Sequence, residues 1–452
     1  MSPSQQLTTR VIGDIQSRVL VSRGQGVLLA VSGGVDSIAL LLLMQRIAPE
    51  LNLKLTAAHF NHCIRPESGE DALFVRNLCE KLDIPLLMGE WEDVSQNPSE
   101  EQARKVRWAF LKQAAIQTGA DWIATGHTAD DRVETLLLNL LRGTGISGLG
   151  GIRWCNPPRI SPLLGQWRSD LEAFLRQEGQ DWREDSSNAE PVYTRNRVRN
   201  RLLPALAEEY NPNIRQNLWE TAETACLEDT LLQEQAARVL SAALVPDASP
   251  WGLITSRYRI ALCTKALASE PPALVRRTLR MAIFRLTGSL QDISFFMVRR
   301  LTDACRKDTS RFDLGLGVSA ECRREQLVLT RQPTLDAGLF PESRFPAAHP
   351  VLGWEMSLSE QKDPSALECI PVNNSGSLVL RSWQDGDRMR PAGLGGTKKL
   401  QDLFVDARLP VWMRRHWPVV VQEGEVIWVP LIAHAEQPSG TSWLNFTLGK
   451  DP

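Results

Sequence analysis

Residues 27–37 read Val-Leu-Leu-Ala-Val-Ser-Gly-Gly-Val-Asp-Ser, which is five apolar residues followed by a glycine-rich turn. An all-apolar run of this length is typical of a strand buried on both faces of a parallel sheet. Apolar residues dominate again from Ile38, which predicts a helix over residues 36–45. The segment therefore predicts a strand, a short loop and a helix in direct succession.

The turn in this segment has the properties of an anion-binding site. Gly33 and Gly34 allow the backbone to approach a ligand closely, and the N-terminus of the following helix adds positive potential. The hydroxyls of Ser32 and Ser37 can donate hydrogen bonds to phosphate oxygens. A carboxylate in such a site repels phosphate unless a divalent cation lies between them, so Asp36 implies Mg²⁺. The competing interpretation is a plain Gly-Gly turn, since the pattern is neither Walker A nor GxGxxG.

The rest of the first half alternates strands with helices. The pattern predicts further strands over residues 53–60, 85–88 and 122–125, and further helices over residues 70–82 and 130–141. Another helix begins at the N-cap Ser99, where Gln102 completes a capping box, and ends at Gly119. Repeated βαβ units predict a parallel sheet covered by helices on both faces.

A second polar cluster, residues 126–135, follows the fourth predicted strand and reads Gly-His-Thr-Ala-Asp-Asp-Arg-Val-Glu-Thr. Ligands of open α/β sheets bind at the carboxyl ends of strands, so we expect this cluster to face the glycine-rich loop. Asp130 and Asp131 lie four and three residues before Glu134, which places the three acids on one helix face. The competing interpretation is structural, because the helix dipole stabilises acids at a helix N-terminus.

Composition limits the class of protein. The 452 residues are 43% hydrophobic and 23% charged, as in an ordinary globular chain of about three domains. The eight cysteines form no CxxC pair, which argues against a zinc ribbon, an iron–sulfur cluster or a disulfide framework and fits a reducing compartment. We expect no signal peptide, and the longest strongly apolar run, residues 38–44, is too short for a membrane span. These features predict a soluble cytoplasmic protein.

Basic residues gather locally, although the net charge is only −2. Four arginines fall within residues 195–201 without an acid, and residues 276–331 hold twelve Lys or Arg against six Asp or Glu. Residues 381–417 hold eight against four, interleaved with tryptophans that we expect in a core. Such runs suit the phosphates of RNA, and an ordinary charged surface is the competing interpretation. The candidate RNA-binding residues are Arg195, Arg197, Arg199, Arg201, Lys398, Lys399, Arg414 and Arg415.

Several motifs together resemble a known family. The residues Ser32, Gly33, Gly34, Val35, Asp36 and Ser37 match the SGGxDS motif of the PP-loop ATP pyrophosphatase superfamily. The further matching segments are residues 60–65, 103–108, 126–135, 141–145, 193–199, 202–204 and 385–391. With them the chain resembles, over most of its length, one branch of that superfamily, the bacterial tRNA(Ile)-lysidine synthetases.

The resemblance implies a fold and a division into domains. The expected fold is a parallel-sheet PP-loop (adenine nucleotide hydrolase-like) α/β domain, a helical middle domain and a small mixed α+β C-terminal domain. We expect the catalytic domain over residues 1–216, a helical tRNA-binding domain over 217–331 and a C-terminal tRNA-binding domain over 377–452. Residues 332–376 are expected to form a linker or a domain edge, since their first part is proline-rich and acidic.

The resemblance also implies a reaction, that of an ATP-dependent carbon–nitrogen ligase. ATP adenylates the carbonyl oxygen at position 2 of the wobble cytidine in tRNA(Ile) with a CAU anticodon, and pyrophosphate is released. The ε-amine of free lysine then displaces AMP and leaves lysidine. ATP, Mg²⁺, this tRNA and lysine are the expected ligands, and no stable protein partner is expected.

Roles for single residues follow from this reaction. The six loop residues are expected to bind ATP, with Mg²⁺ held by Asp36. The candidate catalytic residues are Asp36, Asp130 and Asp131. The candidate lysine ligands are Asp131 and Glu134 for the amine and Arg104, one turn before Arg107, for the lysine carboxylate or a phosphate. For the two arginines, a solvated helix face is the competing interpretation.

Three other classes compete with this prediction. A PP-loop enzyme that thiolates tRNA through an iron–sulfur cluster or a persulfide needs paired cysteines, and the chain has no CxxC. A small-molecule adenylating synthetase of the NAD or GMP type does not require the basic helical domain. An RNA-binding module with a vestigial nucleotide fold does not require the intact loop with Asp36. The lysidine-forming enzyme remains the favoured prediction.

Overall fold

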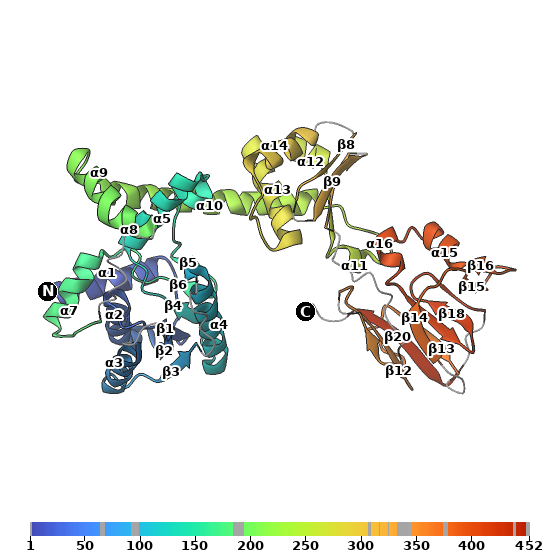
Figure 1. Ribbon diagram of the computed structural model, residues 1–452, viewed down its shortest axis with the longest axis horizontal. Helices are drawn as coiled ribbons and strands as arrows, with labels where there is room; N and C mark the ends of the chain where they lie inside the picture. Colours follow the sequence, from blue (N-terminus) through green and yellow to red (C-terminus); the bar gives the residue numbers. More distant parts are fainter. Residues whose placement is uncertain are drawn as a thin grey trace. The chain divides into compact units, whose positions relative to one another are not determined.

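The computed structural model describes residues 2–63, 68–91, 99–183, 194–305, 309–315, 317–323, 325–331, 343, 345–349, 351–373, 378–436 and 440–448. The chain forms two compact units, Met1–Leu231 and Leu232–Pro452 (Figure 1). The domain boundaries expected at 216/217, 331/332 and 376/377 remain predictions. Within the described residues, no helix combines the length and the apolar character that crossing a membrane requires.

A six-stranded sheet forms the centre of the first unit, with the strand order β3-β2-β1-β4-β6-β5. All neighbours pair in parallel except β5 and β6. The strands are β1 (Gly26–Ala30), β2 (Lys54–Asn61), β3 (Leu86–Glu90), β4 (Trp122–Ala124), β5 (Cys155–Asn156) and β6 (Arg159–Ile160). The four predicted strands are confirmed to within two residues at each end. The two-residue strands β5 and β6 are too short to leave a pattern in the sequence.

The helices that the sequence predicts around this sheet are also confirmed. Ser99 caps α4 with Gln102 in a capping box, and Gly119 ends α4 in the left-handed conformation, with φ of 64°. The helices of the unit are α1 (Pro3–Ser17), α2 (Val35–Leu51), α3 (Ser68–Lys81), α4 (Glu100–Thr118), α5 (Ala129–Arg142), α6 (Ile146–Leu149), α7 (Arg168–Gln177), α8 (Thr194–Arg197), the π-helix η2 (Val198–Leu202) and α9 (Leu203–Glu209). The next helix, α10 (Ile214–Ala243), begins in the first unit and ends in the second.

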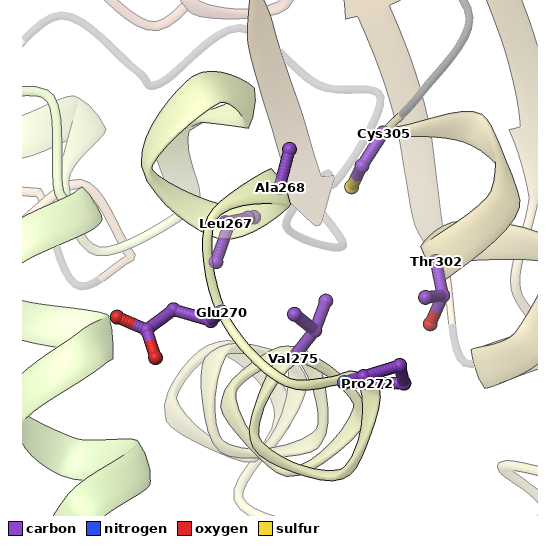
Figure 2. Close-up of a pocket in the computed structure, with 7 residues that line it drawn as sticks. All are labelled: Leu267, Ala268, Glu270, Pro272, Val275, Thr302 and Cys305. Atoms are coloured by element: carbon purple, nitrogen blue, oxygen red, sulfur yellow. The ribbon is translucent and has the colours of Figure 1, made fainter.

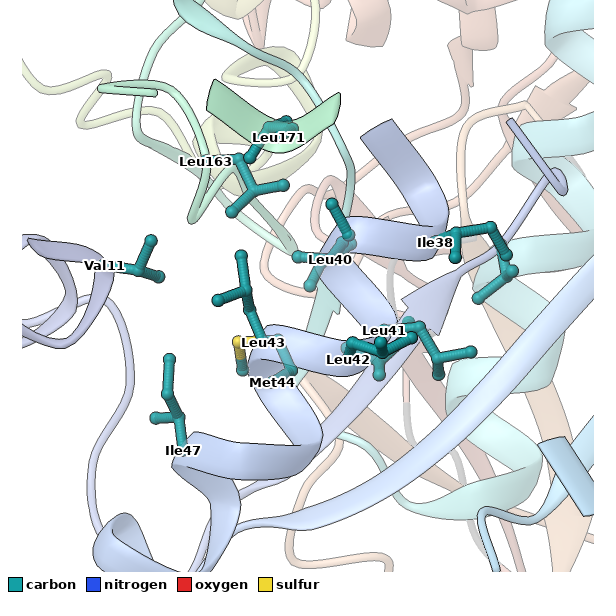
Figure 3. Close-up of a cluster of buried hydrophobic side chains, with 14 of the residues drawn as sticks. Val11, Ile38, Leu40, Leu41, Leu42, Leu43, Met44, Ile47, Leu163 and Leu171 are labelled. Atoms are coloured by element: carbon teal, nitrogen blue, oxygen red, sulfur yellow. The ribbon is translucent and has the colours of Figure 1, made fainter. Parts of the chain in front are cut away.

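Alternate residues of β1 face opposite layers of helices. Leu29 is buried in a cluster with residues of α1, α2 and α7, whereas Leu28 is buried with residues of α4. Figure 3 shows part of the first cluster, to which α1 contributes Val11, α2 contributes Leu43 and α7 contributes Leu171. The helix α2 is therefore buried on nearly all sides, which fixes the glycine-rich loop at its N-terminus.

The first part of the second unit is helical, as predicted, but it also contains a sheet that the sequence did not predict. The helices are α11 (Gly252–Thr255), α12 (Thr264–Ala268), α13 (Pro272–Thr287) and α14 (Phe295–Ala304). The antiparallel sheet has the order β7-β10-β9-β8, formed by β7 (Arg259–Cys263), β8 (Thr309–Asp313), β9 (Val318–Arg323) and β10 (Gln326–Arg331). In β9 the buried Val318, Ala320 and Cys322 alternate with polar residues, so the strand is only half apolar.

The C-terminal part of the second unit consists of two four-stranded antiparallel sheets, a two-stranded ribbon and two short helices. Its core includes Trp354, Trp417 and Trp428, so the expectation that the tryptophans lie in a core is confirmed for Trp417. The elements are β11 (Ala347–Ala348), β12 (Trp354–Ser359), β13 (Glu368–Val372), β14 (Leu378–Ser382), β15 (Arg388–Met389), β16 (Lys398–Lys399), α15 (Leu400–Asp406), α16 (Val411–Arg414), β17 (Pro418–Gln422), β18 (Glu425–Val429), β19 (Ala433–His434) and β20 (Ser442–Leu448).

A small pocket lies among α12, α13 and α14 (Figure 2). Its lining is mostly apolar and includes Leu267, Val275 and Cys305. Its volume of about 10 Å³ leaves room for about one water molecule. The pocket is therefore a packing defect rather than a ligand site.

Candidate active site

The loop between β1 and α2 is closed by one side chain. The Ser37 hydroxyl accepts hydrogen bonds from the backbone N–H groups of Ser32 and Gly33, each at 3.1 Å, and donates to the carbonyl of Gly34 at 2.9 Å. Gly33 has φ of 96°, a conformation that favours glycine. Ser37 thus shapes the loop from within, while its expected contact with phosphate stays a prediction.

Gly126 brings the second polar cluster against this loop. A Cβ atom at Gly126 would lie 2.9 Å from the carbonyl carbon and oxygen of Asp36 and 3.1 Å from the backbone nitrogen of Ser37. Only a glycine at the end of β4 allows such a close approach to the start of α2. The sequence shows that the residue is a glycine, but the need for one depends on this contact between two distant segments.

Asp36 is the carboxylate of the loop. Its Oδ2 lies 3.3 Å from Nη1 of Arg168, whereas its Oδ1 is buried and has no hydrogen-bond partner among the described residues. Burial raises the pKa of Asp36 to about 7, against the opposing charge of Arg168, and the nearby Asp131 and Asp130 raise the pKa further. A buried carboxylate oxygen without a partner fits a ligand of a divalent cation.

The donor set around Asp36 limits the kind of metal site. No group of three or more His, Cys, Asp or Glu side chains in the described part of the chain is arranged to hold a metal ion. Mg²⁺ needs no such group, because it is commonly bound by one or two carboxylates together with substrate phosphates and water. The residues present therefore fit a metal that arrives with a nucleotide and do not fit a permanent protein cage.

Asp130 and Asp131 lie at the start of α5. The carboxylate of Asp131 accepts a hydrogen bond from the backbone N–H of Thr128 at 2.9 Å and so completes a capping box. Asp130 accepts from the backbone N–H of Arg168 at 2.9 Å and pairs with Arg215 at 3.1 Å. Both acids thus lie in the first turn of α5, as the structural interpretation expects. Each acid also has an oxygen paired with an arginine, Arg195 for Asp131 and Arg215 for Asp130.

Glu134, one turn further along α5, is only 1% exposed. Arg195 of α8 donates to its Oε2 at 2.7 Å, and Arg199 of η2 donates to its Oε1 at 2.5 Å. Arg195 also reaches Oδ1 of Asp131 at 2.8 Å. Two of the four arginines in residues 195–201 thus lie against the two candidate lysine-binding acids, whereas Arg197 and Arg201 are exposed.

Several cationic side chains lie near His127 of the polar cluster. The Nδ1 of His127 lies 2.7 Å from the hydroxyl of Thr125. Burial lowers the pKa of His127 to about 4, and Arg159, Arg195 and Arg107 lower it further against the opposing charge of Asp131. His127 is therefore neutral at pH 7, beside guanidinium groups that could accept an anion.

Arg159 is a further candidate site residue, which the sequence did not reveal. Burial lowers the pKa of Arg159, as does the nearby charge of Arg104 on α4. Its Nε is buried without a hydrogen-bond partner among the described residues. Arg159 belongs to the two-residue strand β6, next to Ile123 of β4, and a strand this short has no recognisable sequence pattern.

The remaining candidate residues lie in the second unit. Lys399 of β16 and Arg415, which ends α16, are exposed. Lys398 pairs with Asp406, and Arg414 donates to the carbonyl of Leu409 at 3.1 Å. In the first unit, residues 64 and 65 of the segment 60–65 and residue 193 of the segment 193–199 lie outside the described residues.

Comparison with known proteins gives matches along most of the chain. Residues 5–206 match the model of a PP-loop domain, and residues 378–443 match that of the TilS substrate C-terminal domain. The tRNA(Ile)-lysidine synthase of Solibacter usitatus is 33% identical over 429 residues, with 90% of this chain and 94% of that protein covered. That of Symbiobacterium thermophilum is 35% identical, with 91% and 90% covered.

A solved structure, the U34-tRNA thiolase NcsA from Methanococcus maripaludis, matches with a TM-score of 0.43 and 18% identity. It covers 49% of this chain and 78% of that chain. At this TM-score the match carries no weight, so the assignment depends on the sequence matches. Relatives at 33% and 35% identity that align along nine-tenths of both chains place this chain in the tRNA(Ile)-lysidine synthase family.

Proposed function

We propose that this chain forms lysidine in tRNA(Ile) with a CAU anticodon. ATP adenylates the carbonyl oxygen at position 2 of the wobble cytidine with release of pyrophosphate, and the ε-amine of lysine then displaces AMP. The observation that carries the proposal, in a chain of this family, is the close contact of Asp36 and Ser37 in the phosphate loop with Gly126, which lies three residues before the acid-bearing helix α5. The reaction is proposed for the cytoplasm, where ATP, lysine and tRNA are all available.

The first step uses the loop of residues 32–37. The backbone N–H groups and the N-terminus of α2 would hold the phosphates that leave as pyrophosphate. Asp36, whose Oδ1 has no partner among the described residues, would hold Mg²⁺, which would supply positive charge against that of the phosphates. Arg168, which already contacts Asp36 and Asp130, is placed to balance the same negative charge.

The second step requires that lysine be held by its two charged ends. Asp131 and Glu134 would bind the side-chain ammonium, and one of these acids must take a proton before the amine can attack. Because Arg195 and Arg199 contact both acids, the ammonium must share or replace the guanidinium groups. Arg104, near Arg159, would bind the lysine carboxylate.

We propose that the contacts with tRNA are made by basic residues outside the acid cluster. Arg197 and Arg201 are exposed next to the acid-bound Arg195 and Arg199, so the arginine run divides into inward and outward residues. In the second unit, we propose phosphate contacts for Lys398, Lys399, Arg414 and Arg415. The predicted domains 217–331 and 377–452 would carry the remainder of the tRNA-binding surface.

One assay separates this function from its competitors. AMP formed by the purified protein should require both a CAU-anticodon tRNA(Ile) and lysine, in addition to ATP. AMP formed with tRNA but without lysine, and with a sulfur donor present, would instead indicate a thiolating enzyme. AMP formed without tRNA would indicate a small-molecule synthetase.

A further inference from the structure

Arg132 stands out among the charged residues of α5 because it takes no part in the acid cluster. It lies between Asp131 and Glu134 in sequence, but its side chain is 0% exposed and points into the protein. Its Nε donates to the carbonyl of Gly150 at 3.2 Å and its Nη2 to the carbonyl of Ala222 at 3.2 Å. Its Nη1 donates to the carboxylate of Glu223. All three nitrogens of this guanidinium are therefore engaged.

Glu223, on α10, is the common partner of several elements. Besides Arg132 it accepts hydrogen bonds from Arg18 of α1 at 2.6 Å and from the indole N–H of Trp154 at 3.0 Å. Burial raises the pKa of Glu223, but the hydrogen bond from Trp154 and the charges of Arg132 and Arg18 outweigh burial and leave the pKa lowered. Glu223 is therefore ionised at neutral pH and holds Arg132 as a true ion pair.

Contacts along one face of α10 extend this arrangement. Arg215 pairs with Asp130, Trp219 donates to the carbonyl of Leu164 at 3.0 Å, and the ring of Trp219 lies 5.7 Å from the guanidinium of Arg132. Arg215, Trp219, Glu223 and Cys226, spaced by three or four, lie on this face, together with Ala222 and Asp229. Gly150 fits against the backbone of Cys226, where a Cβ atom would be 3.3 Å away. The helices α5 and α10 are thus joined at two places, by Arg215 with Asp130 and by Ala222 and Glu223 with Arg132.

We propose that Arg132, through its ion pair with Glu223, is a positioning residue for lysine transfer. Its hydrogen bonds fix the rotation of α5 about its own axis, and this rotation sets where Asp131 and Glu134 lie relative to the phosphate loop. The inference depends on the proposed function, because it assigns Arg132 to the step in which these two acids hold lysine. Arg132 itself touches no substrate in this role.

The energetics of buried ion pairs favour a positioning role over a purely stabilising one. Removing two charges from water costs about as much as their attraction returns, so well-packed apolar residues of the same volume often give equal or greater stability. An apolar contact, however, does not fix a rotation as three hydrogen bonds in different directions do. A displacement of about 1 Å in a reacting group can lower a rate about 100-fold, so small rotations of α5 matter for catalysis.

The test breaks the ion pair with single substitutions, replaces it with two apolar side chains in a double variant, and compares the stability and the activity of each protein. Arg132→Met and Glu223→Gln each break the pair, and Arg132→Met with Glu223→Met replaces it by apolar side chains. We expect all three to lower kcat for lysine- and tRNA-dependent AMP formation about 10- to 100-fold and to raise the KM for lysine, while the KM for ATP stays within about twofold. The double variant should recover a Tm near that of the unchanged protein but not its kcat, and Arg132→Lys should retain more activity than Arg132→Met.

Asp229→Asn is the matched control. Asp229 is buried on the same helix and pairs with Arg153, but this pair joins α10 to the segment after α6 rather than to α5. It should lower the Tm and leave kcat within about threefold. The proposal fails if the double variant regains activity together with stability, or if Asp229→Asn lowers kcat as much as Arg132→Met at matched Tm. If the unchanged protein forms no lysine-dependent AMP, the proposed function fails instead, whatever the variants do.

Discussion

Asp36 is a carboxylate that the fold buries without pairing it fully. Its pKa is raised by burial from 3.8 to about 7, and one of its oxygens has no partner among the described residues. A carboxyl whose pKa rises on folding binds more protons in the folded state than in the unfolded state. It therefore destabilises the fold fully above pH 7 and not at all below about 3.8. Such a cost is expected of a group kept for a bound cation.

Asp36→Asn should stabilise the ligand-free protein while it destroys the first step. At pH 8 we expect an increase of about 1–3 kcal/mol in the free energy of unfolding, because the amide carries no charge to bury. The increase should shrink towards pH 5, where the native carboxyl is already protonated, and thermal unfolding across this pH range measures it. Pyrophosphate release should fall at least about 100-fold. Normal pyrophosphate release, or a lower Tm at pH 8, would remove Asp36 from the metal site.

Glu134→Gln should impair the second step more than the first. The neutral amide cannot hold the ammonium of lysine or accept its proton, whereas the phosphate loop is unchanged. Rapid-quench experiments at low lysine concentration should therefore detect adenylated tRNA that accumulates. Glu50→Gln, at an exposed acid near the C-terminal end of α2, serves as the control and should leave both steps unchanged. Equal loss of both steps in Glu134→Gln would place Glu134 in the ATP site or in the fold.

The end of β4 and the start of α2 depend on each other at Gly126. Gly126→Ala places a methyl group 2.9 Å from backbone atoms of Asp36, so one of the two elements must shift. We expect a loss of about 1–3 kcal/mol in stability and a weaker affinity for ATP, measured by calorimetry. Gly13→Ala in α1 is the control, since nothing lies within 4 Å of the new methyl group. It should stabilise the protein by up to about 1 kcal/mol. Unchanged ATP affinity in Gly126→Ala would show that this contact does not shape the nucleotide site.

The elements predicted from the sequence were those with local causes. The strand, loop and helix of residues 26–51 follow from an apolar run and two glycines, and the capping box of Ser99 follows from two residues three apart. The sheet β7-β10-β9-β8 was not predicted, because strands such as β9 alternate charged with apolar residues and gain stability only from pairing. The ion pairs Arg195–Glu134 and Arg132–Glu223 join residues 61 and 91 positions apart, and no local pattern predicts them.

The division of the chain matters for experiments on tRNA binding. The two compact units divide after Leu231, inside α10, and the part of this helix before the division carries Glu223 and Asp229, whose partners Arg132 and Arg153 also lie in the first unit. A truncation at residue 217 would remove both acids and damage the catalytic unit. Substitution of surface charges in the full chain therefore tests tRNA binding more cleanly.

Neutralising Lys399 and Arg415 together should weaken tRNA binding and flatten its dependence on salt. Both side chains are exposed, and each lost phosphate contact should reduce the slope of log K against log salt by about one. Filter binding at several salt concentrations measures the slope. Lys362→Gln, at another exposed lysine, is the control and should leave the slope unchanged. Weaker binding with an unchanged slope would mean that Lys399 and Arg415 act through folding.

The identity of the product decides whether the whole account is correct. A CAU-anticodon tRNA(Ile) incubated with the purified protein, ATP and lysine can be digested to nucleosides and its wobble nucleoside analysed by mass spectrometry. We predict that cytidine at this position is replaced by cytidine carrying one lysine with loss of one water, only when ATP and lysine are both present. An unmodified wobble cytidine, or a nucleoside that contains sulfur instead of lysine, would contradict the proposed function.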